Sequence, residues 1–152
     1  DTHRRQLGRA VQFPVHHGPP LRELARGHLL ALVSNFDYTP TAMDILENAG
    51  VADLFQSILV SDAVGWRKPR REIFGLALDQ LGVEPGRALF VGDRADIDVI
   101  GAHGLGMHAA WINPDGTAFP EGLAPPEYEI RDLAELRAIV GLVTASEPGN
   151  PS

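Results

Sequence analysis

The sequence predicts an α/β protein built on a doubly wound parallel sheet. Segments with strand-like and helix-like hydrophobic patterns alternate along the chain. The strand-like segments are continuous apolar runs, which is typical of parallel strands covered by helices on both faces. Polar residues that could carry chemistry follow these runs directly, where ligands bind in sheets of this kind. The 152 residues fit one domain of common size.

The expected helices have recognisable ends and apolar faces. The first has proline at its start and glycine at its stop, and the second ends at Gly50. The third is expected to turn four apolar residues toward the core: Ile73, Leu76, Ala77 and Leu81. In chain order we expect helix 19–27, strand 28–35, helix 39–51, strand 55–62, helix 69–83, strand 87–93, helix 96–106, strand 107–113, strand 128–130 and helix 132–142.

Composition excludes several classes of protein. A net charge of −7 argues against a nucleic-acid partner. The chain has no cysteine, which excludes disulfides and thiolate metal sites. Its longest apolar run, residues 29–33, is too short to span a bilayer, and no basic-then-apolar leader opens it. We therefore expect a cytoplasmic protein with no membrane partner. Nothing in the sequence specifies an oligomeric state.

The acidic cluster behind strand 87–93 is the first candidate site. Asp93 follows the strand through Gly92, where backbone can approach closely, and Asp98 lies five residues later. Two carboxylates at one edge of a sheet are typical ligands of Mg²⁺. Acidic residues are also common at helix starts, where the helix dipole favours them, so both interpretations stay open. We expect Asp96 to be exposed or to cap the helix.

Two further candidates lie after other apolar runs. Lys68 is the only lysine among 13 basic residues, and its compact charge could neutralise a carboxylate and a phosphate together. It is therefore a candidate catalytic and phosphate-binding residue, although a solvated lysine before a helix is the ordinary alternative. Ser34 and Asn35 follow strand 28–35, and a hydroxyl with backbone N–H groups there could bind phosphate. The alternative is that Ser34 and Asn35 only connect the strand to the following loop and bind nothing.

Three segments resemble, in order and spacing, the motifs of a known family. They are LALVSNFD (30–37), GWRKPRREIF (65–74) and ALFVGDRADIDVIGAHGLGM (88–107). They are similar to the second, third and fourth motifs of the haloacid dehalogenase superfamily of hydrolases, in particular its phosphatase-like branch. The similarity covers residues 18–142 and implies a three-layer, Rossmann-like core over 18–143. Residues 1–17 would be a cap remnant or linker, and we expect a disordered tail over 144–152.

The resemblance also implies a chemistry. An aspartate on the first strand of such enzymes attacks phosphorus, a second aspartate acts as acid and base, and Mg²⁺ assists. Asp93 would then be a metal ligand, and Asp98 a second, outer-shell acid. Ser34 and the Asn35 N–H would hold the phosphoryl oxygens of a small phosphomonoester, and Lys68 would neutralise charge. The Gly-Asp-x4-Asp spacing favours metal-dependent phosphate chemistry over metal-free dehalogenation.

The family's first motif, Asp-x-Asp-x-Thr/Val after an apolar strand, is not found upstream of Ser34. The nucleophile, the acid/base and most of the cap are therefore expected to be missing from this chain. The family's first strand is central, so its loss would leave a slot between strands 28–35 and 87–93, with costly unpaired backbone groups. Residues 10–15 are the only local candidate to fill the slot, and Pro14 counts against them.

Two function classes follow. The chain is either part of a Mg²⁺-dependent phosphohydrolase, inactive alone, or a non-catalytic protein that keeps a metal- or phosphate-binding pocket. A response-regulator-like receiver is a weaker third interpretation. Such a domain needs a lysine at the end of its last strand, and Lys68 comes too early.

Overall fold

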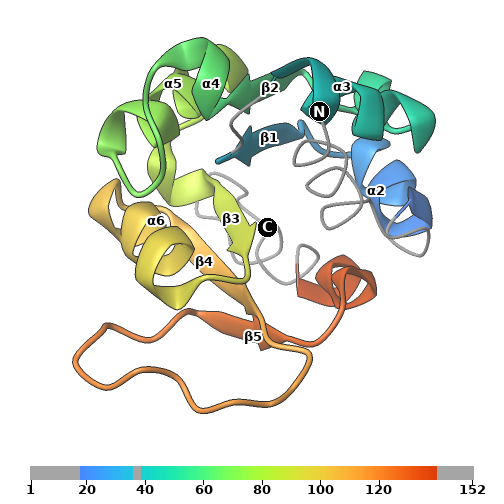
Figure 1. Cartoon of the computed structure of the whole chain (residues 1–152). Helices are drawn as coiled ribbons and strands as arrows, with labels where there is room; N and C mark the ends of the chain where they lie inside the picture. The colour runs from blue at the N-terminus through green and yellow to red at the C-terminus, as the bar shows by residue number, and fades with distance from the viewer. Residues whose placement is uncertain (1–17, 36–38, 140–152) are drawn as a thin grey trace, which may run out of the picture.

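The predicted alternation of strands and helices is present in the computed structural model, which describes residues 18–35 and 39–139 (Figure 1). The helices are α2 (Gly18–Ala25), α3 (Thr39–Asn48), α4 (Ser61–Val64), α5 (Arg71–Leu81) and α6 (Ile100–Gly104). The strands are β1 (Ala31–Ser34), β2 (Ser57–Val60), β3 (Leu89–Gly92), β4 (His108–Ile112) and β5 (Tyr128–Ile130). Short 3-10 turns cover Ala52–Leu54, Pro85–Arg87 and Leu133–Glu135, a π-helical turn covers Ala95–Val99, and residues 136–139 are helical.

Two elements differ from their predicted form. The predicted strand 55–62 ends at Val60, and α4 begins at the next residue, so Asp62 lies in a helix instead of at a strand end. The predicted helix 96–106 is a π-helical turn followed by α6. In both places the chain turns into a helix within a few residues of the strand's carboxyl end.

The strands form two parallel sheets, and no described strand joins them. β1 pairs with β2, and the second sheet has the order β3-β4-β5. Figure 1 shows β1 and β3 as the facing strands of the two sheets. Every residue of β1 and β3 is half-buried, whereas Leu59 and Val60 of β2 and Ala109 of β4 are at most 3% exposed. The greater exposure of β1 and β3 than of β2 and β4 agrees with the prediction that a central strand is missing between them.

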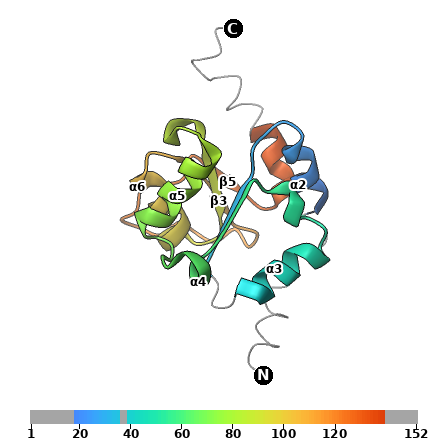
Figure 2. The same cartoon turned by 90° about the horizontal axis from the view of Figure 1, so that it is seen from above.

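Helices cover both faces of the strands, as a doubly wound fold requires. Seen from above, α4, α5 and α6 lie on one side of the strands, and α2 and α3 on the other (Figure 2). The chain is therefore a three-layer α/β structure. Of the predicted domain limits, 1–17 and the tail 144–152 lie outside the described residues, as does the proposed slot filler 10–15.

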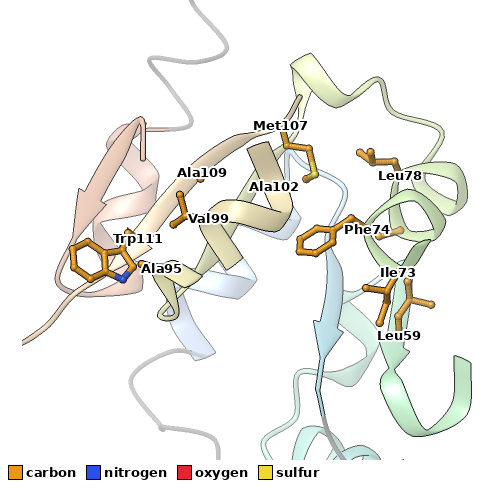
Figure 3. Packing of buried hydrophobic residues seen from close by; sticks show 11 residues of the cluster. Leu59, Ile73, Phe74, Leu78, Ala95, Val99, Ala102, Met107, Ala109 and Trp111 are labelled. Atoms are coloured by element: carbon orange, nitrogen blue, oxygen red, sulfur yellow. The ribbon is translucent and has the colours of Figure 1, made fainter. Parts of the chain in front are cut away.

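The main hydrophobic core lies between α5, α6 and the strands, and Figure 3 shows its residues. Phe74 of α5 is 1% exposed, and its ring centre lies 4.8 Å from that of Phe90 on β3. Of the four residues predicted to face inward from α5, Ile73 and Ala77 are buried and Leu76 packs half-buried against the core, whereas Leu81 is half-buried outside it. Phe74 and Leu78 are also buried, because α5 turns the face that carries Phe74 toward β3 and α6.

None of the described helices is long and apolar enough to cross a membrane.

The carboxylate of Glu127, directly before β5, should make stability depend on pH. Partial burial raises the pKa of Glu127, but the Ala109 N–H, 2.7 Å from Oε1, and His103 lower it by more, so the pKa lies below its usual value. A depressed pKa contributes stability above the unfolded-state pKa, and this contribution is lost as pH falls through the folded-state pKa.

We expect Glu127→Gln to lower the unfolding free energy at neutral pH by at most about 1 kcal/mol, because solvent screens a half-exposed carboxylate. The difference from wild type should shrink as the pH falls below the ordinary glutamate pKa. Urea unfolding across this range measures it. Glu121→Gln, an exposed glutamate in the loop before β5, is the control. A difference that persists in acid would contradict the assignment.

Candidate functional site at the carboxyl ends of the strands

The predicted site residues lie where β1 and β3 end. Ser34 is the last residue of β1 and Asn35 follows it, while Asp93 follows the last residue of β3. Lys68 comes from the loop between α4 and α5, and Asp98 from the π-helical turn behind β3. Because parallel strands end at the same edge, segments far apart in the sequence meet there.

Lys68 and Asp98 form a largely buried ion pair. Lys68 Nζ donates to Asp98 Oδ1 at 2.8 Å, and their side chains are 14% and 3% exposed. The ammonium also lies 5.5 Å from the centre of the Phe90 ring, within reach of a cation–π attraction. A charge pair shielded in this way is rare unless further hydrogen bonds satisfy it. The structure thus brings together two of the residues that the sequence predicted.

Further contacts hold the Asp98 carboxylate in place. Its Oδ2 accepts the backbone N–H of Arg94 at 3.0 Å. The carboxylate lies directly against Gly92, and a Cβ at Gly92 would overlap it. The close approach that the sequence predicted for Gly92 is therefore an approach by Asp98. Both carboxylate oxygens therefore accept an N–H.

Asn35 contacts Lys68 through its side chain. Oδ1 accepts the Lys68 backbone N–H at 2.8 Å, and Nδ2 donates to the Lys68 carbonyl at 3.0 Å. Ser34 is half-buried and lies opposite Val60 in the β1–β2 register. Asn35 and Lys68 are thus neighbours, as a shared phosphate site requires.

Asp93 is exposed, and its backbone is held from β4. Trp111 is 5% exposed, and its indole N–H donates to the Asp93 carbonyl at 3.1 Å. Trp111 faces Gly92 in the strand register and meets the Phe119 ring edge-on at 5.1 Å. The sequence did not predict this contact. An aromatic residue with a polar N–H inside an apolar strand was the available signal, because a buried indole N–H needs an acceptor.

Asp96 is separate from this cluster. Both oxygens of its exposed carboxylate accept from the Arg94 guanidinium, at 3.1 and 2.9 Å. The hydrogen bond to Arg94 is the main reason why the pKa of Asp96 lies below its usual value. The expectation that Asp96 is exposed is correct.

The donor set fits Mg²⁺ in part. Among the described residues, no three His, Cys, Asp or Glu side chains converge as a metal-binding group. Mg²⁺ commonly uses one or two carboxylates with waters and phosphate oxygens, and the exposed Asp93 suits that role. Asp98, bonded to Lys68 and to the Arg94 N–H, is suited to orient groups around such an ion. Further protein oxygens would have to come from a segment opposite β3.

Comparison with known proteins adds a family context. A model of the haloacid dehalogenase-like hydrolase family matches residues 21–106. Pyrimidine 5'-nucleotidase YjjG of Escherichia coli K12 is 36% identical over 96 residues, which are 62% of this chain and 42% of that protein. The (S)-2-haloacid dehalogenase of Pseudomonas sp. strain YL is 37% identical over 124 residues, 80% of this chain and 51% of that protein.

A solved structure agrees with these matches. The crystal structure of a HAD phosphatase from Thermococcus onnurineus superposes with a TM-score of 0.71 at 39% identity, covering 81% of this chain and 55% of that one. The chain spans about half the length of the curated relatives it matches. The relatives' names include a nucleotidase and a dehalogenase, so the comparisons identify a hydrolase family and leave its substrate class open.

Proposed function

This chain belongs to the haloacid dehalogenase-like hydrolase family, and on that premise we propose that, when complete, it is a Mg²⁺-dependent phosphatase of a small phosphomonoester. The observation that carries the proposal is the 2.8 Å contact between Lys68 Nζ and Asp98 beside the exposed Asp93. It supports the proposal because a buried cation and two carboxylates at the strand ends would lie where substrates bind in parallel sheets.

Each site residue has a role in this proposal. Lys68 neutralises negative charge that develops on the phosphoryl group, and Asp98 orients its ammonium. The Ser34 hydroxyl and the Asn35 N–H donate hydrogen bonds to phosphoryl oxygens. Asp93, with Asp98 behind it, would hold Mg²⁺, which supplies electrostatic stabilisation of the phosphate when bound. The attacking aspartate would come from a strand between β1 and β3, where the described residues leave the two sheets unpaired.

The lack of a described strand between β1 and β3 also supports a second candidate, a non-catalytic protein. No described strand pairs with both β1 and β3, and Lys68 is bonded to Asp98, so this chain keeps a polar cluster at the strand ends but supplies no carboxylate opposite β3 from its described residues. We therefore propose that the 152-residue chain alone does not hydrolyse phosphate esters. The net charge of −7 supports the absence of a nucleic-acid partner, and a cytoplasmic location stays a prediction.

An aryl phosphate assay with Mg²⁺ tests both candidates. We expect no turnover from the chain alone, and turnover when it is extended at its N-terminus by an apolar strand followed by Asp-x-Asp. Asp93→Asn should abolish that turnover, while Asp96→Asn, which changes a carboxylate outside the cluster, should leave it within about twofold.

Three results would contradict parts of the proposal. Metal-dependent turnover by the chain alone would show that it is a working enzyme by itself. An extended protein that binds its added strand yet hydrolyses nothing would favour the non-catalytic candidate. If the protein released halide from a 2-haloacid and a chelator did not reduce the rate, its activity would be dehalogenation and not phosphate hydrolysis.

A further inference from the structure

We propose that Asn35 is a positioning residue, whose side chain clamps the backbone of Lys68 and thereby holds the Lys68 ammonium at Asp98. The catalytic meaning of the clamp rests on the proposed function. The clamp itself rests on contacts among described residues. It differs from the phosphate-binding role expected of Asn35, which used the backbone N–H and left the side chain unassigned.

The clamp consists of two hydrogen bonds of opposite direction. The Lys68 N–H donates to Asn35 Oδ1 at 2.8 Å, and Asn35 Nδ2 donates to the Lys68 carbonyl at 3.0 Å. Lys68 lies between α4 and α5, outside any helix or strand, so no regular secondary structure bonds its peptide groups. A side-chain amide has one acceptor and one donor end, which matches the two backbone groups of a single residue.

The clamp determines where the lysine side chain starts. Asn35 is joined to the end of β1, so its side chain ties the loop at Lys68 to the sheet across 33 residues of sequence. From this anchored backbone the ammonium reaches Asp98 Oδ1 at 2.8 Å. A lysine side chain has four flexible bonds and gains little from a single ion pair unless its backbone is already in place. Loss of the clamp should therefore release Lys68 toward solvent.

The chain contains a second clamp of the same kind, which serves as a matched control. Asn113 follows β4 as Asn35 follows β1. Its Oδ1 accepts the Thr117 N–H at 3.2 Å and its Nδ2 donates to the Thr117 carbonyl at 2.7 Å. Asn113 is 4% exposed, so its loss should cost at least as much stability. The side-chain hydrogen bonds of Asn113 go to Thr117 and Glu129, and among the described residues none joins it to Lys68 or Asp98.

Chemical labelling of Lys68 tests the proposal, because Lys68 is the only lysine. Trinitrobenzenesulfonate modifies exposed amines, and peptide mass spectrometry separates Lys68 from the N-terminal amine. In buffer where the protein is folded, we expect Lys68 of Asn35→Ala to be modified about tenfold faster than Lys68 of wild type. This is the factor expected for the loss of one to two hydrogen bonds. Asp98→Asn, which removes the partner carboxylate, supplies the reference rate of an unpaired Lys68. Asn113→Ala should leave the rate within about twofold of wild type.

A second measurement tests the hydrogen bond of the Lys68 backbone N–H directly. Lysine labelled with ¹⁵N yields one backbone amide signal, that of Lys68, and its hydrogen exchange should be about tenfold faster in Asn35→Ala. An unchanged labelling rate in Asn35→Ala would overturn the proposal. Equal acceleration in Asn35→Ala and Asn113→Ala would also overturn it, because general loosening would then explain both.

These readouts need no turnover, so they are independent of the proposed phosphatase activity. If Lys68 responds as expected while the strand-extended protein hydrolyses no phosphate ester, the proposed function fails and the clamp stands. If the extended protein is active and Asn35→Ala retains its full kcat/KM, the positioning role fails and the proposed function stands.

Discussion

Gly92→Ala is expected to destabilise the protein by about 3–5 kcal/mol, the usual cost of breaking a buried ion pair and leaving one charge without its partner. Gly92 ends β3 in extended backbone, so the effect does not come from an unusual backbone angle. A Cβ there would overlap the carboxylate of Asp98, whose side chain is 3% exposed. Asp98 would have to leave Lys68 and the Arg94 N–H.

Urea unfolding measures this loss, and a glycine elsewhere supplies the control. Gly75 lies inside α5, and a Cβ there would meet nothing within 4 Å. Gly75→Ala should therefore stabilise the protein by about 0.5–1 kcal/mol, because alanine favours helix over glycine. Gly92→Ala should also expose Lys68 to amine reagents. Wild-type stability with a protected Lys68 would show that Asp98 can be held without the space at Gly92.

Phe74→Ala is expected to cost about 3–5 kcal/mol of unfolding free energy. The ring is 1% exposed and packs against Phe90. It also fills the space left by Gly101 of α6, where a Cβ would overlap the ring. Figure 3 shows Phe74 pointing from α5 toward the helix that carries Ala102. No described strand pairs β1 with β3, and α5 packs on β1 and β2, so the Phe74 ring against Phe90 of β3 is one contact that joins the two sheets.

Thermal and urea unfolding of Phe74→Ala measure the effect. Leu29→Ala, at a leucine that is 53% exposed, is the control and should change stability by no more than about 0.5 kcal/mol. If the two sheets were held together mainly by other contacts, Phe74→Ala would cost far less than a typical large-to-small change in a core. In that case the main contact between the sheets would have to lie elsewhere.

Much of the fold could be predicted because hydrophobic periodicity is a local property. The strand over Tyr128–Ile130 appears with its predicted limits, and the described strands form two sheets that no described strand joins, in agreement with the predicted loss of a central strand. Boundaries were less predictable. Asp62 was expected at a strand end and lies in α4, because the chain begins a helix immediately after Val60. Leu81 was expected in the core but is only half-buried, because the orientation of α5 depends on where Phe74 finds space.

The sequence by itself determined the class of fold, the family and the residue types at the strand ends, because each of these depends on patterns within short segments. Only the tertiary structure decided which of those residues meet. It pairs Lys68 with Asp98, separates Asp96 from them, and assigns the side chain of Asn35 to the backbone of Lys68. Such contacts join residues about 30 positions apart. Their geometry is set by how helices pack on the sheet, which no local pattern specifies.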